Sequence, residues 1–257
     1  MKAIEIINEL FSWAPGDYTR TCDTLKAGSP DTEVKKVAVC CFPEVNAIRE
    51  AADWGAQLFI THEPLDFNEP ATPVAIKKRE LIESTGMTFY RYHDHPHRAP
   101  VDLICEGEIK ALGLCGRFEG RDAYGNNRMT LDTPITPRAL AAHIEKALGI
   151  AHVRICGAAD VPCTNLAMGW GAPAGVLEDL ADETVEIVIV GETCEWKMAE
   201  YARDAAHLGF KKALLLLGHC GSERDGMAHI AQLLQEKLPQ LEVRFFNSEE
   251  VYTYPER

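Results

Sequence analysis

Short apolar runs alternate with helical patterns along most of this chain, and this alternation constrains the fold more than any other feature. In the first half, the expected helices and strands are, in order, residues 3–13, 37–41, 46–54, 57–60, 74–84 and 88–92. Gly55 and Gly86 stand just past the ends of two of these helices, where glycine commonly ends a helix. Strands that alternate with helices are typical of a largely parallel sheet with helices on its faces. We therefore predict an α/β fold.

The same alternation resumes after a segment rich in Gly, Asp, Asn and Arg, residues 116–127, which we interpret as a loop. Beyond it, the expected elements are residues 138–148, 153–157, 165–169, 186–191, 195–208, 213–218, 225–238 and 243–246. Thr136 and Pro137 would cap and open the first of these helices. We therefore predict two α/β domains with largely parallel or mixed sheets, residues 1–125 and 126–257. The C-terminal segment of the second domain could pack back on the first.

The composition excludes several classes of function. With 26 basic against 39 acidic residues, the formal net charge is −13, and an acidic protein repels the phosphate backbone of nucleic acids. No apolar run approaches the length of a membrane span, and residues 1–10 have the pattern of an amphipathic helix instead of a signal peptide. Nine cysteines without CxxC spacing indicate reduced thiols. We expect a cytoplasmic protein that binds neither nucleic acid nor a membrane.

Three clusters of histidine and carboxylate residues follow predicted strands. They are Thr61-His62-Glu63-Pro64, His93-Asp94-His95-Pro96-His97 and Gly218-His219-Cys220-Gly221-Ser222-Glu223. Imidazole and carboxylate groups are ligands of borderline divalent metals, and sites in α/β folds are built at strand ends. In the second cluster, an extended backbone would put all three histidines on one face, and a break at Pro96 would leave two of them together. The clusters therefore predict a metal site.

Each cluster also has an ordinary structural explanation. Polar residues are common at strand ends, and a surface turn can be rich in histidine. Ser222 is a suitable helix N-cap with Asp225 completing a capping box, and Glu223 in the first turn would then interact favourably with the helix dipole. Glycines between residues 169 and 175 are interpreted as a tight turn. Glu192, after an apolar run, is a further acid at a strand end, suited to be a general base or a partner of a metal ligand.

Four motifs along the chain resemble those of a known family. They are Asp23-Thr24-Leu25-Lys26-Ala27-Gly28, Thr61-His62-Glu63-Pro64-Leu65-Asp66-Phe67, Gly191-Glu192, and Gly218-His219 with Glu223. Their order and spacing are similar to those of the NIF-three-like family, proteins with a dinuclear metal centre that are widely labelled as homologues of a type-2 GTP cyclohydrolase I. The resemblance covers most of the chain. It departs at Trp196, near a position where the family often has a histidine.

The resemblance implies a set of metal ligands. In the family, the ligands are two histidines of the second motif, an aspartate after a mid-chain histidine, and the closing histidine and glutamate. His62, His219 and Glu223 match directly. The set therefore has three matching members and two positions at which this chain differs.

At those two positions the residue types are exchanged. Glu63 replaces the second histidine, and His97 stands four residues after His93, where the family has its aspartate. We interpret this as a compensated exchange, because the total stays at three histidines and two carboxylates. His95 or Asp94 is the alternative to His97 as the ligand.

The resemblance also implies a chemistry and an assembly. Mixed nitrogen and oxygen ligands suit two divalent ions of Zn, Mn or Fe, with Glu223 as the bridging carboxylate and Glu192 in a catalytic role. The expected site lies in the cleft between the domains, and the expected assembly is a homohexamer. We expect a metal-dependent hydrolase of a nucleotide or phosphoester-like small molecule. The alternatives are a metal carrier or regulatory protein without catalysis, and an interaction module whose site is relict.

Overall fold

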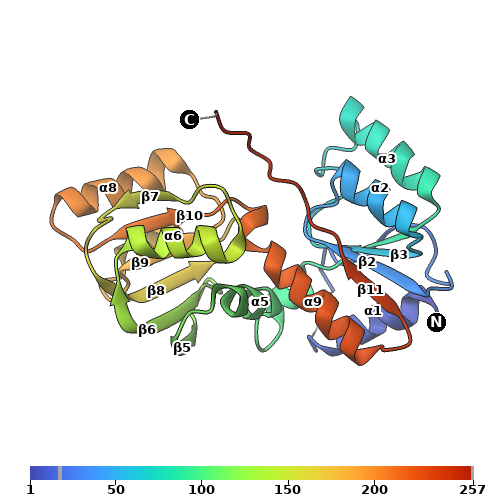
Figure 1. Cartoon of the computed structure of the whole chain (residues 1–257), viewed down its shortest axis with the longest axis horizontal. Coiled ribbons are helices and arrows are strands. Elements are labelled where there is room, and N and C mark those ends of the chain that lie inside the picture. Colours follow the sequence, from blue (N-terminus) through green and yellow to red (C-terminus); the bar gives the residue numbers. More distant parts are fainter. Residues whose placement is uncertain (17–18, 256–257) are drawn as a thin grey trace. The chain divides into compact units, whose positions relative to one another are not determined.

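The protein consists of two compact units, each described here by itself. The computed structural model describes residues 1–16 and 19–255 (Figure 1). Unit 1 comprises residues 1–107 and 226–257, and unit 2 comprises residues 108–225. In the described parts of the chain, none of the helices is long and apolar enough to cross a membrane.

Unit 1 is built on a five-stranded sheet of order β1-β4-β3-β2-β11. Its strands are β1 (Leu25–Ala27), β2 (Lys36–Cys40), β3 (Leu58–Thr61), β4 (Thr88–Arg91) and β11 (Glu242–Phe245). The last four run parallel, and β1 pairs with β4 in the antiparallel direction. The expected parallel sheet is therefore confirmed for this unit, and the neighbouring strands β3 and β4 bring their carboxyl ends to one edge.

The helices of unit 1 begin and end where the sequence supplies caps. They are α1 (Ala3–Ser12), α2 (Val45–Trp54), α3 (Pro73–Thr85) and α4 (Asp94–Arg98), and α5 (Leu103–Leu112) and α9 (Arg224–Lys237) each extend across a boundary between the units. The Thr72 hydroxyl accepts a hydrogen bond from the Ala75 N–H at the start of α3. Gly86 ends α3 in the left-handed conformation, at φ 67°. Phe59 and Phe89 pack at 5.0 Å between ring centroids, on the side of the sheet that carries α2 and α3.

Unit 2 is built on a mixed six-stranded sheet of order β5-β6-β8-β9-β10-β7. Its strands are β5 (Gly116–Arg121), β6 (Asn127–Ile135), β7 (Arg154–Gly157), β8 (Cys163–Gly169), β9 (Ile187–Val190) and β10 (Ala213–Leu216). Only β8, β9 and β10 run parallel, and the pairs at both edges are antiparallel. Its helices include α6 (Pro137–Leu148), α7 (Val176–Ala181) and α8 (Glu200–His207). The expected Thr136 cap is confirmed, since its hydroxyl accepts from the Ala139 N–H.

The segment 116–127, expected to be a loop, is instead strand β5, a turn and the first residue of β6. The turn is held by the Asp122 carboxylate, which accepts from the N–H groups of Tyr124 and Asn126 at 2.8 and 2.9 Å. Gly120, at φ 99°, lies where the register shifts. An edge hairpin exposed to water tolerates polar residues and glycine, and its composition is therefore close to that of a loop.

The two units also differ from the predicted division after residue 125. The hairpin of β5 and β6 pairs with β8, which draws the start of unit 2 back to residue 108. At the other end, β11 pairs in parallel with β2, in the register Phe245 opposite Val39, so the C-terminal strand completes the sheet of unit 1. Pairing between strands far apart in sequence decides both boundaries.

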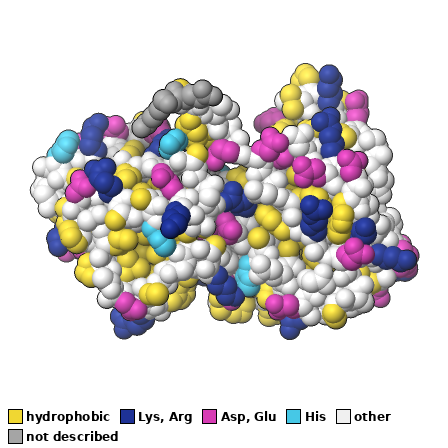
Figure 2. Space-filling view, viewed as in Figure 1, with side chains coloured by type: hydrophobic (Ala, Val, Ile, Leu, Met, Phe, Trp, Pro, Cys, Tyr) yellow, Lys and Arg dark blue, Asp and Glu magenta, His cyan; other side chains and the backbone are white. Residues whose placement is uncertain are grey.

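The face in Figure 2 has Lys and Arg side chains scattered among Asp and Glu instead of gathered in a basic stripe.

Candidate metal-binding site

Three histidines of unit 1 lie together at the carboxyl ends of β3 and β4. His62 directly follows β3, and His93 stands two residues after the end of β4. The rings of His62 and His93 stack with centroids 4.5 Å apart, and the ring of His97 lies edge-on, 5.0 Å from His62 and 5.3 Å from His93. Ligand atoms of all three lie within 4.8 Å of one another. This histidine trio could hold a metal ion.

A short helix selects which histidines of the second cluster join the trio. Of the two alternatives, the extended backbone is not found, because α4 begins at Asp94, directly after His93, and two of the three histidines stay together as a break predicts. A helix repeats every 3.6 residues, so residues 93 and 97 share a face and residue 95 points elsewhere. Pro96 is tolerated because it lies in the first turn of the helix. The structure therefore brings His93 and His97 to His62, and turns His95 away.

Asp23 fixes the start of this helix. Its carboxylate accepts hydrogen bonds from the N–H groups of His93, Asp94 and His95 at 2.7 to 2.8 Å, and contacts His95 Nδ1 at 2.6 Å. Burial opposes ionisation of Asp23, but these hydrogen bonds outweigh it and lower the pKa of the carboxyl. The first motif thus has a physical role, because Asp23 holds the helix that presents His93 and His97.

Gly28 closes the same motif for a different reason. At φ 80° it lies in the left-handed region, and an added Cβ would stand 2.5 Å from Thr88 Oγ1. Glycine permits this close approach of the chain to the start of β4.

Each histidine of the trio has its Nδ1 atom held by an oxygen. His62 Nδ1 contacts the Tyr92 carbonyl at 3.1 Å, His93 Nδ1 contacts Asp94 at 3.0 Å, and His97 Nδ1 contacts Asp102 at 3.2 Å. Carbonyl and carboxylate oxygens only accept, so each Nδ1 carries the proton and each Nε2 of a neutral ring presents its lone pair. Partners of this kind orient histidines that bind metals.

The Nε2 atoms of His62 and His97 face each other at 3.2 Å. Two lone pairs at this distance repel unless a cation lies between or beside them. Burial, together with the neighbouring His62 and His97, lowers the pKa of His93 to about 4. A neutral imidazole is the form that binds metal. The trio is therefore a set of nitrogen donors of the kind that could hold a divalent cation.

Glu63 borders the trio, and Arg91 balances its charge. One Glu63 oxygen lies 3.8 Å from His93 Nε2, and the other lies 3.4 Å from a guanidinium nitrogen of Arg91. Arg91 Nε–H also donates to the His62 carbonyl at 2.9 Å. Sequence reasoning missed Arg91, although a buried arginine at the end of an apolar strand is itself a signal, since such a charge needs a partner.

Asp94, one of the alternatives to His97, lies at the Nδ1 atom of His93. It accepts from the Thr21 hydroxyl and the Cys22 N–H, at 2.9 and 3.1 Å, and it contacts His93 Nδ1. Cys22, His93 and Asp94 form a second group whose ligand atoms lie within 4.8 Å. Burial raises the pKa of the Cys22 thiol to about 12, which disfavours the thiolate form that binds metals.

In unit 2, His219 lies between two carboxylates. Its Nδ1 contacts Glu192 at 2.8 Å and its Nε2 lies 3.2 Å from Glu223. Glu192 follows β9 and His219 follows β10, and these neighbouring parallel strands end at the same edge. Glu223 is buried, with a side chain only 2% exposed. His219 is therefore held as the histidines of the trio are. Its Nδ1 atom contacts the Glu192 oxygen, and its Nε2 atom faces the candidate ligand Glu223.

The expected N-cap role of Ser222 is wrong. Residues Cys220–Ser222 form a 3-10 turn, and the Ser222 hydroxyl donates to the His219 carbonyl at 2.8 Å. Helix α9 begins at Arg224, so Glu223 precedes the helix instead of lying in its first turn. The cap comes from elsewhere in unit 2, because the Glu108 carboxylate accepts from the Asp225 N–H at 2.8 Å. Residues far apart in sequence make this contact, which local pattern does not reveal.

Gly171 packs directly against the carboxylate and the imidazole of this pair. It adopts φ 63°, and an added Cβ would overlap the Glu223 carboxylate and stand 2.8 Å from His219 Nε2. The expected tight turn is therefore only part of the explanation. Gly191 likewise packs against the Gly171 carbonyl and the Ser222 hydroxyl, which explains why glycine precedes Glu192. In the sequence, glycines directly after a predicted strand and near candidate ligands could have indicated this close packing.

The two units define the class of an α/β protein whose histidine trio could hold a metal ion, and comparison with known proteins gives the family. The model of the Duf34/NIF3 (NGG1p interacting factor 3) family matches residues 1–251, and the chain belongs to this family. A curated relative from Clostridium perfringens, named GTP cyclohydrolase 1 type 2 homolog, is 24% identical over 97% of both chains. A second protein of that name, from Clostridium acetobutylicum, is 21% identical over 93% of this chain and 91% of the relative.

Solved structures share the fold along the whole chain. Staphylococcus aureus hypothetical protein SA1388 matches with a TM-score of 0.78 at 18% identity, over 99% of both chains. Reduced HcgD from Methanocaldococcus jannaschii matches with a TM-score of 0.75 at 18% identity, over 96% of this chain and 97% of that one. At these identities, the likeness establishes the fold alone.

Proposed function

We propose that this protein binds two divalent metal ions and hydrolyses a nucleotide or phosphoester-like small molecule. The proposed ligands are His62, Glu63, His97, His219 and Glu223. The contact that carries the proposal is the 3.2 Å approach of His62 Nε2 to His97 Nε2, with both Nδ1 atoms held by oxygens. The two rings are oriented with their Nε2 atoms toward each other, as in histidines that share a metal ion.

The donor types favour Zn, Mn or Fe over Mg or Ca, because imidazole suits the former. Bound ions of this kind lower the pKa of a coordinated water and so supply a nucleophile at neutral pH. The chain's own part is to orient the donors. Asp102 fixes the His97 tautomer, and Glu192 fixes that of His219 through its 2.8 Å contact. Between the two roles expected for Glu192, this contact favours positioning of His219 over general-base catalysis.

Elemental analysis of the purified protein tests the metal sites. We expect two equivalents of metal per chain, and a loss in each of His62→Ala, His97→Ala and His219→Ala. His207→Ala is the matched control, because His207 is exposed at the end of α8. Unchanged metal content in His97→Ala would disprove the compensated exchange between Glu63 and His97. A metal-free parent protein would disprove the proposal and leave the relict-site alternative.

A substrate screen separates the hydrolase from the metal carrier. Loaded protein is offered nucleotides and phosphomonoesters, and release of phosphate or base is measured. We expect turnover that disappears in His219→Ala and not in His207→Ala. Full metal loading without turnover, together with rapid transfer of metal to a chelator, would favour the carrier. The homohexamer and the cytoplasmic location also remain proposals; light scattering after gel filtration tests the first.

A further inference from the structure

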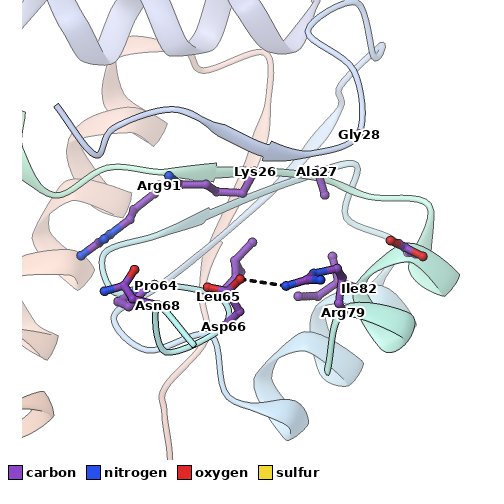
Figure 3. Close-up of a pocket in the computed structure, with 11 residues that line it drawn as sticks. Lys26, Ala27, Gly28, Pro64, Leu65, Asp66, Asn68, Arg79, Ile82 and Arg91 are labelled. Carbon is purple, nitrogen blue, oxygen red and sulfur yellow. Dashed lines mark hydrogen bonds and ion pairs between the residues drawn. The ribbon is translucent and has the colours of Figure 1, made fainter. Parts of the chain in front are cut away.

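A cavity in unit 1 lies between the segment that follows β3 and helix α3. Its volume is about 420 Å³. It is lined by β1 and Gly28, by residues 64–66 and Asn68 after β3, by one face of α3 and by Arg91 at the end of β4 (Figure 3). The carboxyl ends of parallel strands are the usual place for ligands in α/β folds. None of the roles derived above uses this cavity.

Three cationic side chains from three different elements surround the cavity. Lys26 comes from β1, Arg79 from α3 and Arg91 from β4. In Figure 3, Lys26 lies on the strand above the cavity and a dashed line joins Arg79 to Asp66 below it, an ion pair of 3.0 Å. Asp66 and Glu83 are the two acids of the lining. An excess of cations is unusual in a chain whose net charge is −13.

Arg91 is the buried member of this set, with 9% of its surface exposed. Its Nε–H donates to the His62 carbonyl at 2.9 Å, and one terminal nitrogen contacts Glu63 at 3.4 Å. A guanidinium carries five N–H donors, so these contacts leave others unused. Among the described residues, no further partner of this guanidinium is found, and Arg91 lines the cavity. A buried arginine with spare donors is suited to bind an oxyanion through two hydrogen bonds.

The loop beside the cavity has an unusual backbone. Phe67 and Asn68 both adopt the left-handed conformation, at φ 59° and 58°, although neither is glycine. The Lys78 ammonium lies 4.6 Å from the centre of the Phe67 ring. Strain of this kind is retained where the surrounding structure enforces it, and it gathers at ligand-binding loops.

We propose that this cavity binds the phosphoryl group of a small-molecule ligand, held by Arg91, Lys26 and Arg79. Three cationic side chains from three elements suit a group with three terminal oxygens better than a planar carboxylate with two. Arg91 lines the cavity and also contacts the His62 carbonyl and Glu63, so one side chain borders both the cavity and the histidine trio. The inference rests on the proposed function only for the reaction of the bound phosphoryl group at the metal. Binding of phosphate in the cavity requires no metal ion.

Calorimetric titration of the full chain, stripped of metal with a chelator, tests this site. Inorganic phosphate is the probe, at a fixed ionic strength set with chloride. We expect saturable binding that is weakened about tenfold or more in Lys26→Met, because a charged hydrogen bond is lost while the apolar stem stays. Lys77→Met is the matched control, since Lys77 is an exposed lysine of α3 outside the cavity lining, and it should bind as the parent does.

A second variant tests the buried arginine. Arg91→Lys keeps the positive charge and removes the planar fork, so we expect weaker phosphate binding, measured at a temperature well below the melting temperature of both proteins. Equal affinities in Lys26→Met, Arg91→Lys and Lys77→Met would overturn the proposal. Binding of succinate as tight as that of phosphate would overturn the phosphoryl assignment. Metal content is measured separately. A metal-free protein that still binds phosphate would contradict the proposed metal-dependent function and leave the phosphate site standing.

Discussion

His62 and His97 stand 35 residues apart in the sequence, and their Nε2 atoms are 3.2 Å apart in the fold. Each of the two rings is held at its other nitrogen by an oxygen that can only accept a hydrogen bond. The tautomer, and with it the direction of the lone pair, is therefore set by the Tyr92 carbonyl and the Asp102 carboxylate. These partners control whether the rings can bind a cation.

Asp102→Asn should weaken metal binding about 10- to 100-fold. The amide nitrogen of asparagine donates where the carboxylate oxygen accepted from His97 Nδ1, so the ring must move its proton to Nε2 and lose the lone pair. Competition with a fluorescent chelator measures the affinity. Asp132→Asn, at an exposed residue of β6, is the control and should bind metal as the parent does. Equal affinities in the two variants would show that the contact does not set the tautomer.

Gly171→Ala should remove metal from the His219 and Glu223 pair, because its methyl group occupies the space of the carboxylate. Gly149→Ala is a close control: Gly149 also has a positive φ, 64°, but an added Cβ meets nothing within 4 Å. Both variants lose roughly 1 kcal/mol of stability from the backbone strain. Elemental analysis, made under conditions in which both variants are folded, should find less metal in Gly171→Ala alone. An equal loss of metal in Gly149→Ala would show that backbone strain causes the effect.

Asp23→Asn should destabilise unit 1 by about 2–4 kcal/mol at pH 7, because one oxygen that accepts from two groups of His95 becomes a donor. The pKa of Asp23 is lower in the folded state than the ordinary 3.8. Its stabilisation is therefore complete above about pH 4 and disappears as the pH falls through the folded pKa. Urea unfolding at several pH values should show the two proteins converging in acid. A constant difference down to pH 2 would contradict this.

Asp179 in unit 2 should give the opposite pH dependence. Burial and the neighbouring Asp122 raise its pKa to about 7, against the pull of Arg128. A raised folded pKa means that its contribution is present below about pH 4 and declines as the pH rises to 7, by at most about 1.4 kcal/mol per pH unit. Asp179→Asn should flatten the stability profile between pH 5 and 8. An equally steep profile in Asp182→Asn and in Asp179→Asn would assign the slope to another group.

Strands, most helices and their caps could be predicted from local pattern, because each depends on residues within a few positions of one another. Thr136 caps its helix as expected, and the four apolar parallel strands of unit 1 match runs that alternate with helices. The hairpin at residues 116–127 could not be predicted, because a pair of strands exposed at the edge of a sheet does not need apolar residues. The partition into units likewise depends on β11 pairing with β2, a long-range choice.

The sequence by itself determined which residue types could form the candidate site and that they follow strands. It also determined the family, through motifs of fixed spacing. The tertiary structure alone decided the membership of the histidine trio, since the helix at Asp94 turns His95 inward to Asp23 and His97 toward His62. It alone showed that Gly171 supports Glu223. The physical reason is that ligand direction depends on hydrogen bonds between distant residues, which no local periodicity encodes.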